Sequence, residues 1–213
     1  MRVFENIDCM EGMKRYPDKY FELAIVDPPY NIKFSKYNRV QQYPNGETFI
    51  SNQYHKSDWD YYKPDKNYFV ELFRVSKNQI IWGGNYFELP VFKHFIFWYK
   101  HQPVKNFADG ELAWSSFDMP AACFDYMCYG NINADPDGKI HPTQKPIALY
   151  KWLLTKYAKP NDKILDTHVG SASSLIACED MGFDYVGFEI DKDYYDAATK
   201  RINQFRSQLK LAV

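Results

Sequence analysis

Short apolar runs alternate along this chain with segments whose apolar residues recur every three or four positions. The runs have the length of buried strands, and the periodic segments have the spacing of amphipathic helices. The predicted strands are 1–7, 21–26, 78–82, 92–99, 111–117, 162–166 and 184–190, and the predicted helices are 9–16, 67–75, 146–158, 173–182 and 193–205. Strands that alternate with helices predict an α/β fold, in which helices cover both faces of a mostly parallel sheet.

The helix predicted over 146–158 shows how the pattern defines a buried face. Pro146 is expected at its first position, where the missing N–H costs nothing. The residues expected to face the sheet recur at helical spacing and are Ile147, Tyr150, Leu154 and Tyr157.

Length and composition predict one domain over 1–213, because 213 residues with 46% hydrophobic composition can bury one substantial core. A polar stretch from about 35 to 66, rich in Tyr, Asn and Gln, has the length of a functional or disordered loop. No apolar run is long enough for a membrane and the first residues do not resemble a signal peptide, so we expect a cytoplasmic protein. The four cysteines form no CxxC pair and are expected to be free thiols.

The net charge is −1, but the charge is unevenly distributed. Lysines gather in 89–108 and 139–163, whereas acids gather in 179–196. A local basic patch can hold phosphates even when the total charge is near zero. Solvated surface lysines are the alternative interpretation of either run.

Acidic residues stand at the ends of four of the predicted strands. They are Asp8, Asp27, Asp166 and Glu189. Since ligands of open α/β sheets bind at the carboxyl ends of the strands, these acids are expected at one site. Each also has a plainer explanation, because Asp often caps helices and forms turns.

The segment that contains Gly170 and Glu189 narrows the class of ligand. Gly170 opens a helix after a strand, and Glu189 ends the next strand 19 residues later. That spacing suits a ribose diol, but the full GxGxxG motif of pyrophosphate binding is missing. A nucleoside without phosphate fits better, and crowded acids favour a cationic one such as S-adenosylmethionine.

Three motifs, "DPPY" at 27–30, "HPTQKP" at 141–146 and "LDTHVGSAS" at 165–173, occur in this order. With "NIDCMEGMKRYPD" and "GFEIDKDYYDAATKRI" they resemble the beta-group DNA amino-methyltransferases, in which the catalytic motif precedes the cofactor motif. The resemblance covers most of the chain. It implies a Rossmann-like methyltransferase sheet, S-adenosyl-L-methionine as methyl donor and no metal. His168 and Ala172 stand where the family usually has Phe and a second Gly.

The resemblance also implies a set of cofactor-binding residues. They are Asp8, Asp27, Thr143, Gln144, Lys145, Asp166, His168, Gly170, Ser171 and Glu189. Glu189 would bind the ribose hydroxyls, Asp8 would lie near the adenine ring, and Thr143, Gln144 and Lys145 would hold the methionine end. By itself, a histidine such as His168 is more often structural.

The expected catalytic residues are Asp27, Pro28, Pro29 and Tyr30. The amino group of adenine or cytosine is a poor nucleophile because its lone pair is delocalised into the ring. Asp27 and the carbonyl of Pro28 can accept both amino hydrogens and favour a pyramidal nitrogen whose lone pair points at the methyl group. The prolines restrict the turn, and Tyr30 can stack on a base that has left the duplex. A rigid turn with a surface Tyr is the alternative.

Several other classes fit less well. A cytosine C5-methyltransferase needs a cysteine nucleophile, usually after a proline, and no cysteine here follows one. The sequence has no His/Cys cluster that would suit metal catalysis. It also lacks the glycines of the GxGxxG motif, which a nicotinamide oxidoreductase would need. Methyltransferases of RNA or of protein glutamine usually place the cofactor motif first. Asp rather than Ser before Pro-Pro-Tyr favours N6 of adenine; the 4-amino group of cytosine and a catalytically silent DNA-binding subunit stay open.

Target selection is expected from 31–66 and 100–140, which lie outside the cofactor motifs. Lysines would contact phosphates, and Arg39, Gln41 and Gln42 would read base edges. We expect DNA as the partner and no membrane contact. A homodimer and a cognate restriction endonuclease are left open.

Overall fold

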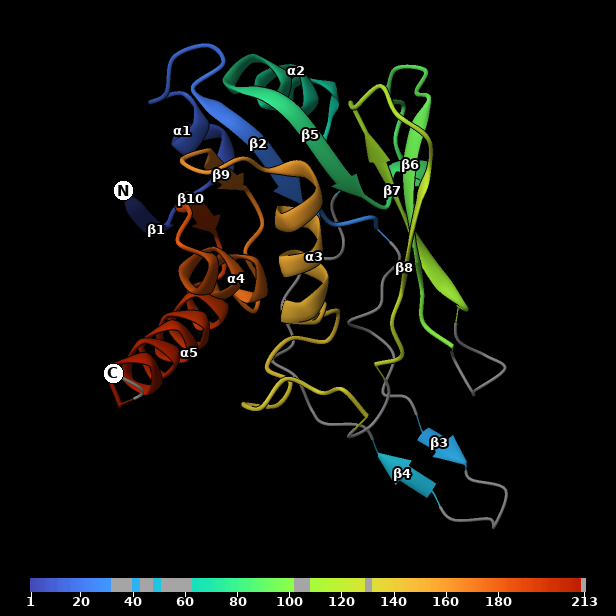
Figure 1. Ribbon diagram of the computed structural model, residues 1–213, viewed down its shortest axis with the longest axis vertical. Coiled ribbons are helices and arrows are strands. Elements are labelled where there is room, and N and C mark those ends of the chain that lie inside the picture. Colours follow the sequence, from blue (N-terminus) through green and yellow to red (C-terminus); the bar gives the residue numbers. More distant parts are fainter. Residues whose placement is uncertain (32–39, 43–47, 51–62, 102–107, 129–131, 212–213) are drawn as a thin grey trace.

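The computed structural model describes residues 1–31, 40–42, 48–50, 63–101, 108–128 and 132–211. Its centre is an eight-stranded sheet in the order β1-β10-β9-β2-β5-β7-β6-β8 (Figure 1). The strands are β1 (Arg2–Asn6), β2 (Phe21–Val26), β5 (Ser76–Trp82), β6 (His94–Tyr99), β7 (Gly110–Ser115), β8 (Ala122–Asp125), β9 (Lys163–Asp166) and β10 (Asp184–Glu189). Every pairing is parallel except those of β7 with β5 and β6, which confirms the mostly parallel sheet.

Helices cover both faces of this sheet, as the alternating pattern predicts. One face packs against α1 (Cys9–Met13) and α2 (Lys66–Val75), and the other against α3 (Ile147–Tyr157), α4 (Ser173–Met181) and α5 (Lys192–Leu211). Strand β2 contributes to both cores: Leu23 and Ile25 lie with α3, whereas Ala24 and Val26 lie with α2. Burial on both faces explains its continuous apolar run.

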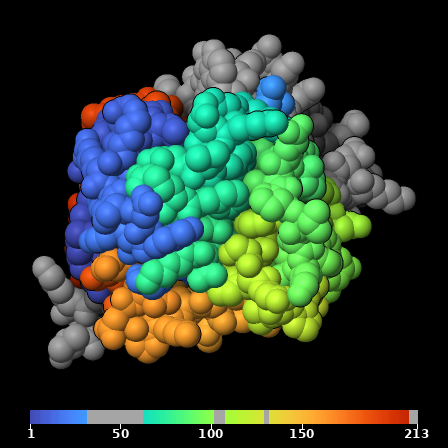
Figure 2. Space-filling model, turned by 90° about the horizontal axis from the view of Figure 1, so that it is seen from above, coloured from blue at the N-terminus to red at the C-terminus, as the bar shows by residue number. Residues whose placement is uncertain are grey.

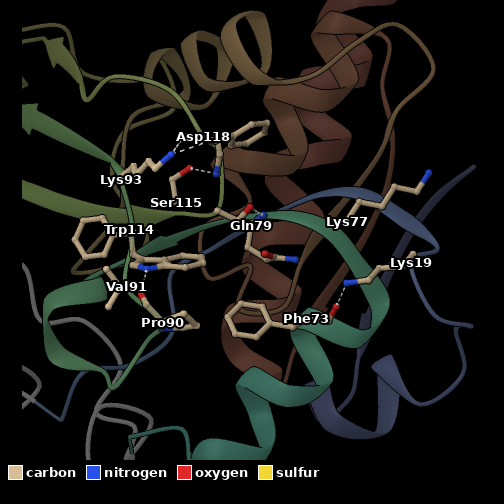
Figure 3. Close-up of a pocket in the computed structure, with 13 residues that line it drawn as sticks. Lys19, Phe73, Lys77, Gln79, Pro90, Val91, Lys93, Trp114, Ser115 and Asp118 are labelled. Atoms are coloured by element: carbon tan, nitrogen blue, oxygen red, sulfur yellow. Dashed lines mark hydrogen bonds and ion pairs between the residues drawn. The ribbon is translucent and has the colours of Figure 1, made fainter.

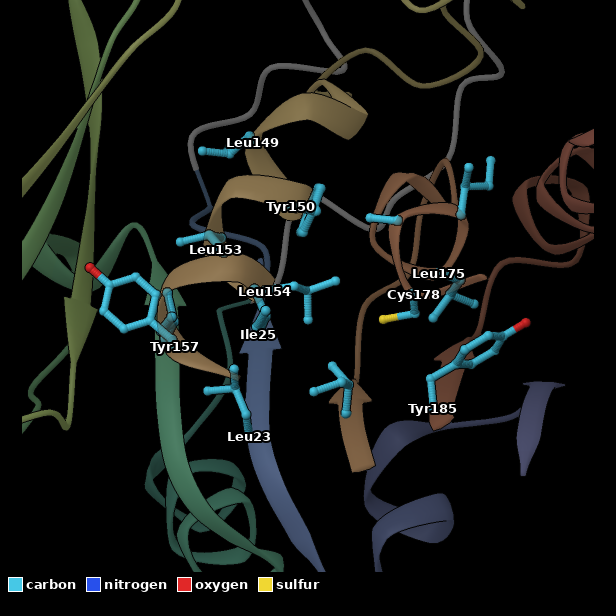
Figure 4. Packing of buried hydrophobic residues seen from close by; sticks show 14 of the residues in the cluster. Leu23, Ile25, Leu149, Tyr150, Leu153, Leu154, Tyr157, Leu175, Cys178 and Tyr185 are labelled. Carbon is cyan, nitrogen blue, oxygen red and sulfur yellow. The ribbon is translucent and has the colours of Figure 1, made fainter. Parts of the chain in front are cut away.

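Helix α3 differs from its prediction in two details. Pro146 is the N-cap, with φ −68° and ψ 146°, and not the first helical residue; its carbonyl accepts the N–H of Leu149 at 3.1 Å. Its buried residues are Leu149, Tyr150, Leu153, Leu154 and Tyr157, whereas Ile147 is only partly buried. Figure 4 shows Leu153 and Leu154 beside Leu23 and Ile25 of β2. The face is rotated because α3 packs against α4 as well as the sheet.

Among the described residues, three short strands and one 3-10 turn were not predicted. Strand β8 pairs with β6 at the edge of the sheet, and η3 (Gly84–Tyr86) follows β5. Strands β3 (Val40–Gln42) and β4 (Thr48–Ile50) form a separate hairpin within the polar stretch, at the lower right of Figure 1. Four residues or fewer carry too little periodicity to be recognised without their pairing partners.

Candidate active site

Four acidic side chains lie on the side of the sheet where neighbouring parallel strands have their carboxyl ends. We call this side of the sheet the acidic edge. Asp27 follows β2, Asp166 ends β9, Glu189 ends β10, and Asp8 comes shortly after β1. These strands are neighbours in the order β1-β10-β9-β2 and run in the same direction. The edge at which open α/β sheets bind their ligands therefore carries four carboxyl groups.

The turn after β2 holds Asp27 by both of its carboxylate oxygens. The hydroxyl of Tyr30 donates to Oδ1, and the ammonium of Lys145 donates to Oδ2. Pro28 between them is buried and Pro29 is partly buried. The stiff turn therefore brings the Asp and the Tyr of one motif together, and a second motif supplies the cation.

Lys145 is the buried member of a partly buried cluster of charges. Its side chain is 3% exposed, and its Nζ lies 3.0 Å from Glu111 on β7, in addition to the contact with Asp27. Lys100 also donates to Glu111, and the indole of Trp82 lies 5.3 Å from the Lys145 Nζ. Two carboxylates and two ammonium groups thus balance each other beside the carboxyl ends of β2 and β5 and the start of β7.

Electrostatics keep this cluster ionised. Burial alone lowers the pKa of Lys145, but the carboxylates of Asp27 and Glu111 outweigh it and hold that pKa above its ordinary value. Burial alone raises the pKa of Glu111, yet Lys145 and Lys100 lower it to about 2. Since a buried charge is tolerated only when it is paired, each group depends on its neighbours.

The Tyr30 ring lies in an aromatic pocket that depends on Gly83. The ring stacks on Tyr86 with centroids 5.0 Å apart and planes at 16°, and it meets Phe87 edge-on at 6.0 Å. Gly83 has a φ of +65°, and a Cβ there would lie 2.2 Å from Cε1 of Tyr30. Sequence reasoning missed Gly83, although a Gly pair directly after a predicted strand was a usable signal.

Asp166 and Glu189 accept hydrogen bonds mainly from backbone N–H groups in and near the turn between β9 and α4. Gly170, with φ +53°, donates its N–H to Glu189 at 2.8 Å, and Asp191 donates to the same carboxylate at 2.9 Å. Asp166 accepts the His168 N–H at 3.0 Å and the Ser174 hydroxyl. Burial raises the pKa of Glu189, and it raises the pKa of Asp166 to about 7. This region would therefore be stabilised by a cationic ligand.

The two departures from the family pattern have local explanations. The His168 Nδ1 lies 2.9 Å from the Thr167 hydroxyl, and its ring meets Tyr68 edge-on at 5.3 Å. Burial lowers the pKa of His168 to about 4, so its ring is neutral at pH 7. Ala172 has a φ of +63° and is fully buried. A left-handed conformation of this kind costs a non-glycine residue about 1–2 kcal/mol, which explains why a Gly suits the position.

The "HPTQKP" segment is held by its own side chains. Gln144 donates to the Asp135 carboxylate and to the Gly138 carbonyl, both at 3.1 Å, and accepts the Ile140 N–H at 2.9 Å. The Thr143 hydroxyl lies 3.1 Å from the His141 ring. Gln144 therefore organises the preceding turn.

Asp8 is the N-cap of α1. Its side chain accepts the N–H groups of Met10 and Glu11, at 2.9 and 3.3 Å. The plainer explanation for a strand-end acid, helix capping, thus describes the contacts of Asp8. A capping carboxylate keeps unused lone pairs and can accept a further hydrogen bond.

Arg201 joins the "HPTQKP" side of the site to the Gly170 turn. Its side chain is 2% exposed and forms ion pairs with Asp135 at 2.8 Å and Asp137 at 2.7 Å. It also donates to the Ser171 carbonyl at 2.8 Å and to the Ser173 hydroxyl at 2.9 Å. One buried guanidinium therefore fixes two segments that lie far apart in the sequence.

Replacing Arg201 with Met is expected to destabilise the protein by about 3–5 kcal/mol, because two carboxylates lose their buried cation. For a chain of this size the midpoint of thermal unfolding should fall by roughly 6–20 °C. Circular dichroism during heating measures it, with Lys200→Met as the control at an exposed neighbouring position. An unchanged midpoint would contradict the joining role of Arg201.

A pocket of about 450 Å³ lies at the opposite edge of the sheet, lined by residues that include Lys19, Gln79, Lys93 and Trp114 (Figure 3). The residues that line the pocket come from the segments that Figure 2 shows side by side from above: the N-terminal segment in blue, the α2 segment in teal and the β6–β7 region in green. The lysines are already engaged: Lys19 donates to the Phe73 carbonyl at 2.6 Å, and Lys93 pairs with Asp118. This pocket contributes nothing to the acidic edge.

Parts of the predicted recognition regions, 31–66 and 100–140, lie outside the described residues, and so does Arg39. Gln41 and Gln42 lie on β3, where the side chains are not described. Within the described residues, no helix is long and apolar enough to cross a membrane. The same part of the chain holds no group of three or more His, Cys, Asp or Glu side chains arranged for a metal ion.

A family model described as DNA methylase matches residues 51–200, a range that contains "HPTQKP" and "LDTHVGSAS" but not "DPPY". The type II methyltransferase M.HinfI of Haemophilus influenzae is 24% identical over an alignment of 248 positions, gaps included, which covers 93% of this chain and 67% of that protein.

Solved structures share the fold. The M1.HpyAVI–SAM complex matches with a TM-score of 0.61 at 20% identity, covering 95% of this chain and 100% of that chain. PvuII DNA methyltransferase, described as cytosine-N4-specific, matches with a TM-score of 0.56 at 14% identity, covering 96% of this chain and 91% of its own.

Proposed function

This chain belongs to the N6/N4 DNA methylase family, and from that premise we propose that it transfers a methyl group from S-adenosyl-L-methionine to N6 of adenine in DNA. The observation that carries the proposal is the Asp27 carboxylate, held by Tyr30 and Lys145 at the end of β2. It lies one strand away from Asp166 and the Gly170 turn in the sheet order. The carboxylate that can accept hydrogen bonds from the target amino group therefore lies next to the acids that would bind the cofactor.

The residues at this edge fit the proposed methyl donor. S-Adenosyl-L-methionine, when bound, supplies an electrophilic methyl group on a cationic sulfur. The carboxyl groups of Asp166 and Glu189, both with raised pKa values because of burial, favour a positively charged ligand. Glu189 would accept the ribose hydroxyls in addition to its backbone partners, since a carboxylate offers about four lone-pair sites.

The remaining cofactor residues are proposed from the motifs. Gly170, Ser171 and His168 lie on the turn between β9 and α4, and Asp8 would lie near the adenine ring. Thr143 and Gln144 would lie at the methionine end. We treat 1–213 as one methyltransferase domain, with 31–66 and 100–140 as its DNA-recognition insertions.

Asp27 acts on the target base. Its carboxylate and the Pro28 carbonyl would accept the two amino hydrogens and direct the nitrogen lone pair toward the methyl carbon. The nitrogen–carbon bond would form as the sulfur–methyl bond breaks, which leaves the neutral thioether S-adenosyl-L-homocysteine, and the methylated amino group would lose one proton to solvent. Tyr30 would stack on the flipped base, which a duplex must release before its amino group can react.

The choice of adenine rests on Asp27, because Asp rather than Ser before Pro-Pro-Tyr resembles the adenine-specific members. The cytosine-N4-specific PvuII enzyme has the same fold, so the 4-amino group of cytosine is the second candidate. Both bases present an exocyclic amino group to the same acceptors, and pocket size would separate them.

Incubating unmethylated DNA with the protein and S-adenosyl-L-methionine is expected to yield 6-methyladenine in digested nucleosides, measured by mass spectrometry. Asp27→Ala protein is the negative control. Exclusive formation of 4-methylcytosine would reassign the target base. The absence of both products on every DNA tested would contradict an active enzyme and favour a silent DNA-binding subunit.

A further inference from the structure

Lys145 lies at the meeting point of three neighbouring strands. Asp27 follows β2, Trp82 ends β5 and Glu111 lies near the start of β7, and the sheet places these strands in the order β2-β5-β7. Lys145 itself comes from the segment directly before the Pro146 cap of α3. Its side chain therefore reaches from the helical layer to the edge of the sheet.

The ammonium of Lys145 already has two carboxylate partners. It donates to Asp27 and lies 3.0 Å from Glu111, and Glu111 is bound in turn by Lys100. A methionine carboxylate on Lys145 would be the third carboxylate at this ammonium and would lie beside Asp27 and Glu111. Because charges of like sign repel strongly in a site of low dielectric, the present partners are favoured.

The contacts of Asp27 define the plane of its carboxylate. The terminal torsion of an Asp side chain is soft and broadly distributed, so the carboxylate can rotate unless both oxygens are held. Lys145 holds Oδ2, and Tyr30 meets Oδ1 on the side of the aromatic pocket. A carboxylate oxygen has two lone pairs, so Oδ1 keeps one for a further hydrogen bond after it accepts the Tyr30 hydroxyl.

We propose that Lys145 and Glu111 are positioning residues for methyl transfer: Glu111 fixes the Lys145 ammonium, and Lys145 orients the Asp27 carboxylate toward the target amino group. This inference rests on the proposed function. It assigns a role to Glu111, and it gives Lys145 the catalytic carboxylate as its partner in place of the methionine carboxylate.

Single-turnover methylation with Lys145→Met tests the proposal. The rate should fall on the order of 10- to 100-fold, because a misplaced acceptor loses much of its orienting effect. Affinity for S-adenosyl-L-methionine, measured by calorimetry, should stay within about twofold of wild type. Lys145→Arg keeps the charge and should restore most of the rate. Lys77→Met removes a lysine paired with Glu22 at the other end of the sheet and should behave as wild type.

Glu111→Gln gives a second route if Lys145→Met folds poorly. It should lower the rate several-fold, and combining it with Lys145→Met should slow the reaction no further than Lys145→Met alone, since both act through Asp27. Independent, multiplying losses would contradict this chain of contacts.

A cofactor fragment separates the two roles of Lys145. 5′-Methylthioadenosine lacks the methionine carboxylate, so a lysine that binds this carboxylate would matter for S-adenosyl-L-methionine and not for the fragment. Loss of affinity for the former alone, in Lys145→Met, would overturn the proposal. Wild-type rates in both variants would also overturn it while leaving the proposed function intact, whereas an inactive wild type would refute the function itself.

Discussion

Asp27→Ala is expected to abolish methyl transfer while leaving the affinity for S-adenosyl-L-methionine nearly unchanged. The carboxylate acts on the base, so its loss removes an acceptor that matters only when the amino nitrogen reacts. Groups that act on the reacting atoms in this way contribute about 10²- to 10⁴-fold. Lys145 keeps Glu111 as a partner in the variant, so folding should survive.

Single-turnover rates and calorimetry measure the two effects separately. A 2-aminopurine at the target position should brighten on binding to wild type and to Asp27→Ala alike, because base flipping does not need the carboxylate. Asp118→Ala removes an exposed carboxylate paired with Lys93 at the opposite edge of the sheet and serves as the control. Substantial methylation by Asp27→Ala would return Asp27 to the role of a turn-forming residue.

Gly83→Ala is expected to weaken binding of an extrahelical target base by about 5- to 150-fold, the equivalent of about 1–3 kcal/mol of stacking. The new methyl group would lie 2.2 Å from Cε1 of Tyr30, so the ring must leave its place on Tyr86. Affinity for DNA with an abasic partner opposite the target, measured by fluorescence anisotropy, reports the loss.

Gly182→Ala is the matched control, because it has a φ of +78° and no atom within 4 Å of an added Cβ. It carries a similar backbone cost without a collision, so it should lower stability and leave target affinity unchanged. In a Tyr30→Ala background, Gly83→Ala should cause little further loss of affinity, since the ring is already absent. Equal losses in both backgrounds would separate Gly83 from Tyr30.

The local sequence pattern was sufficient to predict a helix or strand and its bounds where the segment carries its own boundary signals. The run 21–26 was predicted as a strand and is β2 with the same bounds, because six apolar-rich residues end at Asp27 and a proline pair. The helix predicted over 67–75 is α2, which begins one residue earlier behind the Asp65 cap. Strand β8 was not recognisable, because it becomes a strand only by pairing with β6.

The site residues that stand at the carboxyl ends of parallel strands were predictable from the sequence. The acids after β2, β9 and β10 were expected at one edge, and parallel pairing brings their strand ends there. Glu111 and Gly83 were missed, since neither belongs to a motif. Glu111 lies near the start of β7, which is antiparallel to β5, so the amino end of β7 lies beside the carboxyl end of β5. A rule based on the carboxyl ends of strands could not include it.

The sequence by itself determined the order of helices and strands, the acids at the strand ends and the stiff turn from Asp27 to Tyr30, because periodicity and turn chemistry are local properties. Only the tertiary structure decided which side chains meet there. Lys145 reaches Asp27 across 118 positions, and Gly83 makes room for the Tyr30 ring. Such contacts depend on the order of strands in the sheet, and many strand orders are compatible with the same alternation of helices and strands.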